Sequence, residues 1–95
     1  MSWKTLNESI ELVERRFHYF PQVFRWRGRR YDIDEVEREW TPPRPPWRRY
    51  YRVHCAAGVV VLYHDLTANT WHLGRARWAA EPSRRARFGL RQIAF

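Results

Sequence analysis

Aromatic and arginine residues alternate on both sides of a single glycine, Gly28. Because successive side chains of a β-strand point to opposite faces, this alternation places Phe24 and Trp26 on one face and the intervening arginines on the other. Glycine supplies the positive φ that a tight hairpin turn needs. The pattern therefore predicts a β-hairpin with arms near residues 22–27 and 29–40, apolar on one face and cationic on the other.

Further strands are expected after this hairpin. Residues 47–56 alternate between apolar and polar side chains, and the pair Ala57-Gly58 is suited to a two-residue turn. Residues 59–63 are apolar on both faces, which is typical of a central strand, and residues 71–78 predict a strand that returns against it. The predicted fold is all-β: a small antiparallel meander forming an SH3-like or partly open barrel of five to six strands.

The N-terminal segment, residues 8–17, is ambiguous. The spacing of Leu6, Ile10, Val13 and Phe17 fits the stripe of an amphipathic helix, whereas Ile10 and Leu12 fit a short strand. The spacing alone slightly favours the helix.

Two irregular points are predicted within the meander. The apolar positions change parity around Asp34, which predicts a β-bulge in the second arm of the hairpin. Residues 41–46 contain four prolines, which lack backbone N–H donors, so this segment is expected to be a stiff connector between strands. We expect one domain over residues 1–80, followed by a basic C-terminal tail over residues 81–95.

The charge is the strongest compositional signal. Seventeen arginines and one lysine stand against ten acidic residues, giving a formal net charge of +8. Such a balance is typical of proteins that bind polyanions, although solvated surface charge or ion-pair networks would give the same composition. A single cysteine, Cys55, cannot form an internal disulfide, which favours a reducing compartment. With no signal-peptide pattern and no apolar run of membrane-spanning length, we expect a cytoplasmic protein with no membrane partner.

No group of residues has the spacing expected of a catalytic site. His54, His64 and His72 lie near Asp65, but their positions do not place them together on one face as metal ligands. Cys55 alternates in phase with apolar neighbours and is expected to point into the core. We therefore predict no enzymatic activity, no catalytic residue, no metal and no cofactor.

The positive evidence is the mixture of aromatic and arginine residues. Small β-barrels that bind single strands combine a basic groove with aromatic side chains on which bases stack. The candidate nucleic-acid-binding residues are Arg25, Arg27, Arg30, Arg48, Tyr50 and Arg52. A domain of this size needs most of its aromatics inside, so Trp26, Trp40, Trp71 and Tyr51 are expected in the core.

An ordered run of motifs over residues 8–78 resembles a bacterial family, domain of unknown function 6504. The run comprises Phe24-x-Trp26-Arg27-Gly28-Arg29-x-Tyr31, Val36-x3-Trp40, Trp47-Arg48-x-Tyr50-Tyr51-Arg52-Val53, Gly58, and Leu62-Tyr63-x-Asp65-x5-Trp71-x-Leu73. The resemblance implies a small all-β module, found alone or fused to the C-terminal end of polymerase-like DNA-damage proteins. It also implies that Glu8 to Arg15 forms a first strand rather than a helix.

We expect a non-enzymatic binding module, associated with DNA repair, that takes single-stranded or primed DNA on its arginine face. The alternative is a module for protein–protein interaction, with a partner in a repair complex, or for homodimerisation. The position of the arginines relative to the acidic residues of segment 32–39 should discriminate between them: separation favours nucleic acid, and interdigitation favours a protein partner.

Overall fold

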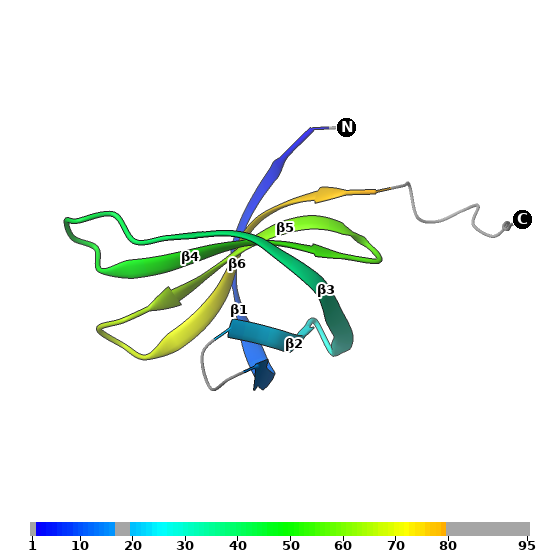
Figure 1. Ribbon diagram of the computed structural model, residues 1–95, viewed down its shortest axis with the longest axis horizontal. Helices are drawn as coiled ribbons and strands as arrows, with labels where there is room; N and C mark the ends of the chain where they lie inside the picture. The colour runs from blue at the N-terminus through cyan, green and yellow to red at the C-terminus, as the bar shows by residue number, and fades with distance from the viewer. Residues whose placement is uncertain (1, 17–19, 80–95) are drawn as a thin grey trace, which may run out of the picture.

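The computed structural model describes residues 2–16 and 20–79, which form a six-stranded barrel (Figure 1). The strands are β1 (Lys4–Arg16), β2 (Phe20–Trp26), β3 (Arg29–Trp40), β4 (Arg48–Cys55), β5 (Gly58–Asp65) and β6 (Thr70–Trp78). Each strand pairs antiparallel with the next, and β1 pairs antiparallel with β6 to close the barrel. The prediction of a small all-β antiparallel barrel is confirmed, while the predicted tail lies outside the described residues.

The hairpin around Gly28 is formed as predicted. Trp26 pairs with Arg29, so Arg27 and Gly28 are the two residues of the turn. Both have positive φ, 53° for Arg27 and 77° for Gly28, as a type I′ turn requires. The apolar face is also as predicted, because Phe24 is fully buried and its ring stacks on that of Tyr31 at 5.0 Å.

The N-terminal segment is a strand, so the helix favoured by residue spacing is wrong. Leu6, Ile10 and Leu12 pack against the core, while Val13, a member of the apparent helical stripe, is 38% exposed. The pairing of β1 is irregular, with register shifts against both β2 and β6. These bulges interrupt the strict alternation by which a strand is recognised in a sequence.

The turn between β4 and β5 differs from the prediction by one residue. Cys55 pairs with Gly58, so the turn residues are Ala56 and Ala57. Gly58 instead begins β5 with φ of 144°, and a Cβ atom there would lie 2.4 Å from the carbonyl oxygen of Arg77. Glycine is needed at this position for the close approach of β6 rather than for the turn.

The core confirms three of the four aromatic predictions. Trp26, Tyr51 and Trp71 are buried in it, whereas Trp40 is half-buried and lies outside the core cluster. Cys55 is buried as expected, and burial raises the pKa of its thiol. Nowhere in the described chain is there a helix with the length and hydrophobicity needed to span a membrane.

Both irregular points predicted within the meander are present. The pairing of β3 with β4 shifts register between Ile33 and Glu35, at the predicted bulge. Residues 41–47 contain no strand and connect β3 to β4 as an extended loop, which projects from one end of the barrel beside the β5–β6 turn (Figure 1). The end of β3, the start of β4, the end of β5 and the start of β6 therefore lie together in an extension of the barrel. The candidate site lies on this extension.

Candidate functional site

A row of aromatic side chains crosses the outer face of four adjacent strands. Trp40 of β3 pairs with Tyr50 of β4, which pairs with Tyr63 of β5, which pairs with His72 of β6. The ring centroids of successive members are 5.3, 5.5 and 4.9 Å apart. Because residues directly opposite each other share a face of the sheet, the four rings form one row, which we call the aromatic row. The rings are stacked at Trp40–Tyr50 and Tyr63–His72 and tilted at Tyr50–Tyr63.

A second row, two residues along β3, β4 and β5 and three residues along β6 where the register shifts, carries arginines. Arg38 pairs with Arg52, which pairs with Val61, which pairs with Arg75. This arginine row lies beside the aromatic row on the same outer face, since side chains two residues apart on a strand share a face. The guanidinium carbon of Arg38 lies 4.6 Å from the ring centroid of Trp40, so the two rows are in contact.

Trp3 packs among the arginines at the other side of the arginine row. Its ring lies 5.2 Å from the guanidinium carbon of Arg52, 5.3 Å from that of Arg75 and 5.2 Å from that of Arg77. Cation–π contacts of this kind hold the guanidinium groups in place without neutralising their charge. No sequence pattern indicated Trp3, because its contacts depend on the pairing of β1 with β6.

A groove of about 340 Å³ lies between the two rows. It is lined by Thr5, Asn7, Trp40, Pro42, Arg48, Tyr50, Val61, Tyr63, Gly74 and Arg75. A Cβ atom at Gly74 would lie 3.3 Å from the Tyr63 ring, so glycine lets this ring lie close against β6. Tyr63 is 6% exposed and belongs to the floor of the groove, while Trp40 and Tyr50 remain half-buried at its wall.

Four arginines of this face have aromatic rather than acidic partners, while Arg52 lies 3.6 Å from Glu37. Within the described chain, Arg38, Arg48, Arg75 and Arg77 form no ion pair with a carboxylate, and the guanidinium of Arg48 lies 4.4 Å from the ring centroid of Tyr63. A hydrogen bond with Tyr50 raises the pKa of Arg48. These four arginines thus keep their positive charge available to an anionic ligand.

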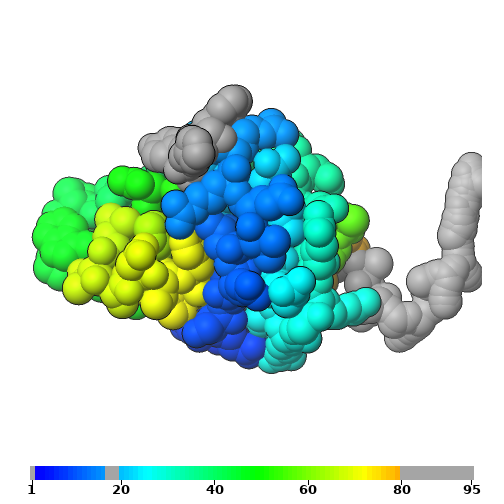
Figure 2. All heavy atoms as spheres, turned by 90° about the horizontal axis from the view of Figure 1, so that it is seen from below, coloured from blue at the N-terminus to red at the C-terminus, as the bar shows by residue number. Residues whose placement is uncertain are grey.

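The arginines of the β2–β3 hairpin are paired with acids instead. Arg25 contacts Glu11 at 3.1 Å and Arg30 contacts Asp32 at 2.9 Å. In Figure 2 the hairpin (cyan) and the start of β4 (green) lie at opposite ends of the molecule, with β1 (blue) between them. The structure therefore divides the predicted binding residues into an ion-paired hairpin group, Arg25, Arg27 and Arg30, and an outer-face group, Arg48, Tyr50 and Arg52.

Some acidic residues of segment 32–39 pair with arginines and others do not, so neither full separation nor full interdigitation is observed. Arg30 pairs with Asp32, and Arg52 lies 3.6 Å from Glu37. Glu37 also accepts a hydrogen bond of 2.6 Å from His54, which lowers the pKa of Glu37. At the start of β4, Arg49 lies 3.5 Å from Glu39, whereas Arg48 forms no ion pair within the described residues, so arginines and acids interdigitate there only in part.

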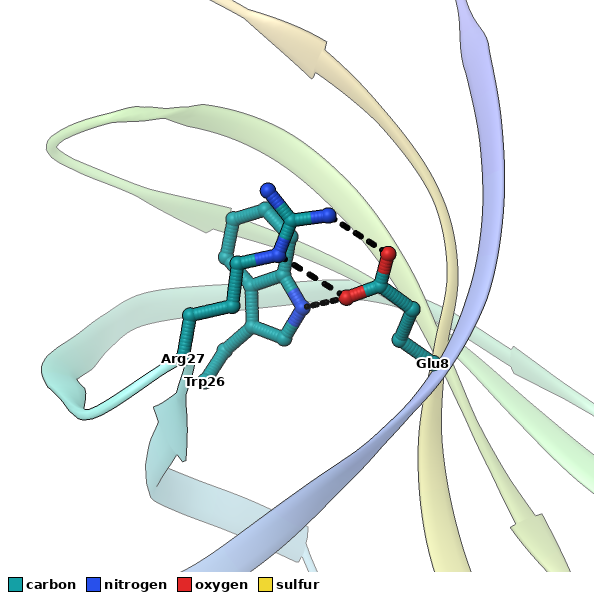
Figure 3. A network of polar contacts seen from close by, with 3 residues as sticks. All are labelled: Glu8, Trp26 and Arg27. Atoms are coloured by element: carbon teal, nitrogen blue, oxygen red, sulfur yellow. Dashed lines mark hydrogen bonds and ion pairs between the residues drawn. The ribbon is translucent and has the colours of Figure 1, made fainter.

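Glu8 binds the hairpin to β1 through three hydrogen bonds (Figure 3). The indole Nε1 of Trp26 donates to its Oε1 at 2.9 Å, and Arg27 donates from Nε at 2.9 Å and from Nη2 at 2.6 Å. The Arg27 guanidinium also lies 4.5 Å from the ring centroid of Trp26. The hydrogen bonds from Arg27 and Trp26 lower the pKa of Glu8.

This contact gives a pH-dependent contribution to stability. Because the pKa of Glu8 is lower in the folded state than its ordinary 4.5, ionised Glu8 stabilises the fold above pH 4.5, and this contribution is lost as the pH falls through the lowered pKa. We expect Glu8→Gln to lower Tm at pH 7, and the difference from wild type to shrink below pH 4.5. Thermal unfolding monitored by circular dichroism from pH 3 to 7 measures this. Glu14→Gln, at an exposed position of the same strand, is the control, and a Tm difference for Glu8→Gln that is independent of pH would contradict the assignment.

The described histidines have structural partners. His64 stacks on Trp71 at 4.4 Å and is hydrogen-bonded to Asn69, while His72 is hydrogen-bonded to Thr70. Over residues 2–16 and 20–79, no three His, Cys, Asp or Glu side chains lie close enough to hold a metal ion together.

Comparisons with known proteins found no matching family model, curated protein or solved structure. The resemblance to domain of unknown function 6504 therefore stays a prediction.

Proposed function

We propose that this protein is a non-enzymatic module that binds single-stranded nucleic acid on the outer face of β3–β6. The observation that carries the proposal is the juxtaposition of two cross-strand rows, one aromatic and one of arginines, with a groove between them. Single-strand-binding surfaces combine these two elements, because bases stack on aromatic rings while cations follow the phosphates.

The arginine geometry supports this ligand over a generic anion. A guanidinium that stacks on a ring still presents its N–H groups at its edge, where they can form two parallel hydrogen bonds with a phosphate. Arg48 lies over the Tyr63 ring and Arg75 pairs with Val61, and both line the groove, while Trp40 and Tyr50 line its wall. A strand lying in the groove would thus place phosphates near cations and unpaired bases near rings.

A role in DNA repair is part of the proposal and depends on the family resemblance alone. A protein–protein or homodimerisation module remains the second proposal. It is favoured by the ion pairs that join Arg25 and Arg27 of the hairpin to β1, which show that part of the arginine content serves contacts between strands.

The test compares two double variants that remove the same charge from different surfaces. Arg48→Ala with Arg75→Ala removes two groove arginines, and Arg25→Ala with Arg30→Ala removes two hairpin arginines. We expect the first to weaken binding of a fluorescent oligothymidylate at least tenfold, about 1.4 kcal/mol, and the second to change it less than threefold. Fluorescence anisotropy at two salt concentrations, with single-stranded, duplex and primed-template DNA, measures the affinities.

Equal losses in both variants would show that binding depends on net charge alone and would contradict the proposed site. Failure of wild type to bind any of the three DNA forms would contradict the proposal altogether. In that case a concentration-dependent mass in sedimentation experiments would support the homodimer.

A further inference from the structure

In the closed barrel, β2 and β3 pair over only part of their length, and we call the unpaired stretch between them the seam. These strands pair only between Val23–Trp26 and Arg29–Asp32. Beyond this point the start of β2 pairs with the end of β1, whereas Ile33 to Trp40 of β3 pairs with β4. In the described chain, this part of β3 therefore has a strand neighbour on only one side.

A groove of about 470 Å³ follows the seam. It is lined by Arg16, Phe20, Pro21, Gln22, Ile33, Asp34, Glu35, Val36, Glu37, Arg38 and Glu39. Phe20, Ile33 and Val36 are half-buried apolar side chains that pack against the core. The groove thus has an apolar part beside a strand edge that is open among the described residues.

The charge of this groove is opposite to that of the molecule. Four of the chain's ten acidic residues line it, against two arginines, although the formal net charge of the chain is +8. Glu37 contacts His54 and Arg52, and Glu39 contacts Arg49. Asp34 and Glu35 form no ion pair within the described residues, so they are available to a cationic partner.

We propose that the β3 edge over Ile33–Glu39 binds an extended basic segment of another protein as an added strand. Main-chain hydrogen bonds to the open edge would provide the affinity, as in other cases of strand addition. Side chains of an added strand alternate between the two faces of the sheet. Apolar residues would therefore lie over Phe20 and Val36 on the core side, and lysine or arginine beside Asp34 and Glu35 on the other side.

The test uses the full chain and a seven-residue synthetic peptide that alternates lysine and valine. Its controls are the same peptide with alternate backbone nitrogens methylated and a peptide with glutamate in place of lysine. We expect the lysine peptide to bind, the methylated peptide to bind at least tenfold more weakly, and the glutamate peptide not to bind. Hydrogen exchange measured by NMR should show slower exchange of amides within Ile33–Glu39 when the lysine peptide is bound.

Two double variants test whether the negative charge of Asp34 and Glu35 contributes to peptide binding. Asp34→Asn with Glu35→Gln should weaken binding of the lysine peptide at least fivefold, while Glu11→Gln with Glu14→Gln, at two exposed acids of β1, should change it less than twofold. Three results would overturn the proposal: no binding of the lysine peptide, equal binding of the methylated peptide, or exchange protection elsewhere than on β3. Binding without strand pairing would identify a purely electrostatic contact. None of these results bears on single-strand binding at the outer face.

Discussion

Replacing Trp26 by alanine is expected to lower the free energy of unfolding by about 3–5 kcal/mol. Its side chain is 8% exposed and its ring stacks on Trp78 at 5.5 Å. Alanine would leave a cavity where β2 meets the end of β6 and would remove the indole donor to Glu8. Urea denaturation monitored by far-ultraviolet circular dichroism measures the change, because five other tryptophans complicate fluorescence.

Trp26→Phe is the matched control for this result. Phenylalanine keeps a buried six-membered ring but loses the rest of the indole with the N–H group that donates to Glu8, so a loss smaller than that of Trp26→Ala is expected, of which the hydrogen bond accounts for about 0.5–1.5 kcal/mol. If both variants lost the same amount, the hydrogen bond rather than burial would be the main contribution. A Trp26→Ala protein as stable as wild type would show that the barrel does not close around this residue.

The hairpin was predictable because its information is local. A two-residue turn, an alternation of period two and a glycine with positive φ all lie within one short segment around Gly28. The same holds for the bulge near Asp34 and for the proline connector, where the deciding residues are neighbours in the chain. Such features depend on backbone geometry and on side-chain parity, both of which a sequence displays directly.

The first strand was not predictable from its own residues. β1 becomes a strand by pairing with β6, some sixty residues away, and its bulges disturb the alternation that would have identified it. Its spacing of Leu6, Ile10 and Val13 fits a helix equally well. Tertiary pairing decides the outcome at such positions.

The aromatic row could not be predicted from the sequence either, because it depends at once on the registers of the β3–β4, β4–β5 and β5–β6 pairs. Trp40 faces Tyr50 only through the β3–β4 register across the proline connector, and Tyr50 faces Tyr63 only because the β4–β5 turn lies at Ala56-Ala57. A slip of one residue in either would move a ring to the other face. The sequence therefore indicated arginine and aromatic residues as candidates, and the structure shows which of them share a surface.

The arginines differ in their partners, although each of them counts equally in the net charge of the chain. In the hairpin, carboxylates within about 3 Å offset the charge of Arg25 and Arg30. On the outer face, rings hold Arg38 and Arg48 in place while their charge stays unbalanced by any ion pair of the described chain. Net charge alone is thus a poor guide to where an anion binds, and the type of partner is a better one.

Tyr50→Ala should weaken single-strand binding by about 1–3 kcal/mol, at least fivefold, if bases stack on the aromatic row. Tyr50 lies between Trp40 and Tyr63 and is half-buried at the groove, so its loss interrupts the row without opening the core. Fluorescence anisotropy over a range of salt concentrations measures the affinity. Tyr50→Phe, which keeps the ring, should bind within threefold of wild type.

The salt dependence distinguishes stacking from charge. Each arginine lost from a phosphate contact should reduce the slope of log affinity against log salt by about 0.7 for a single strand. Arg48→Ala is therefore expected to flatten the slope, while Tyr50→Ala should lower the affinity at every salt concentration and leave the slope nearly unchanged. If Tyr50→Ala also flattened the slope, Tyr50 would act by positioning Arg48, which lines the same groove, and not as a stacking surface.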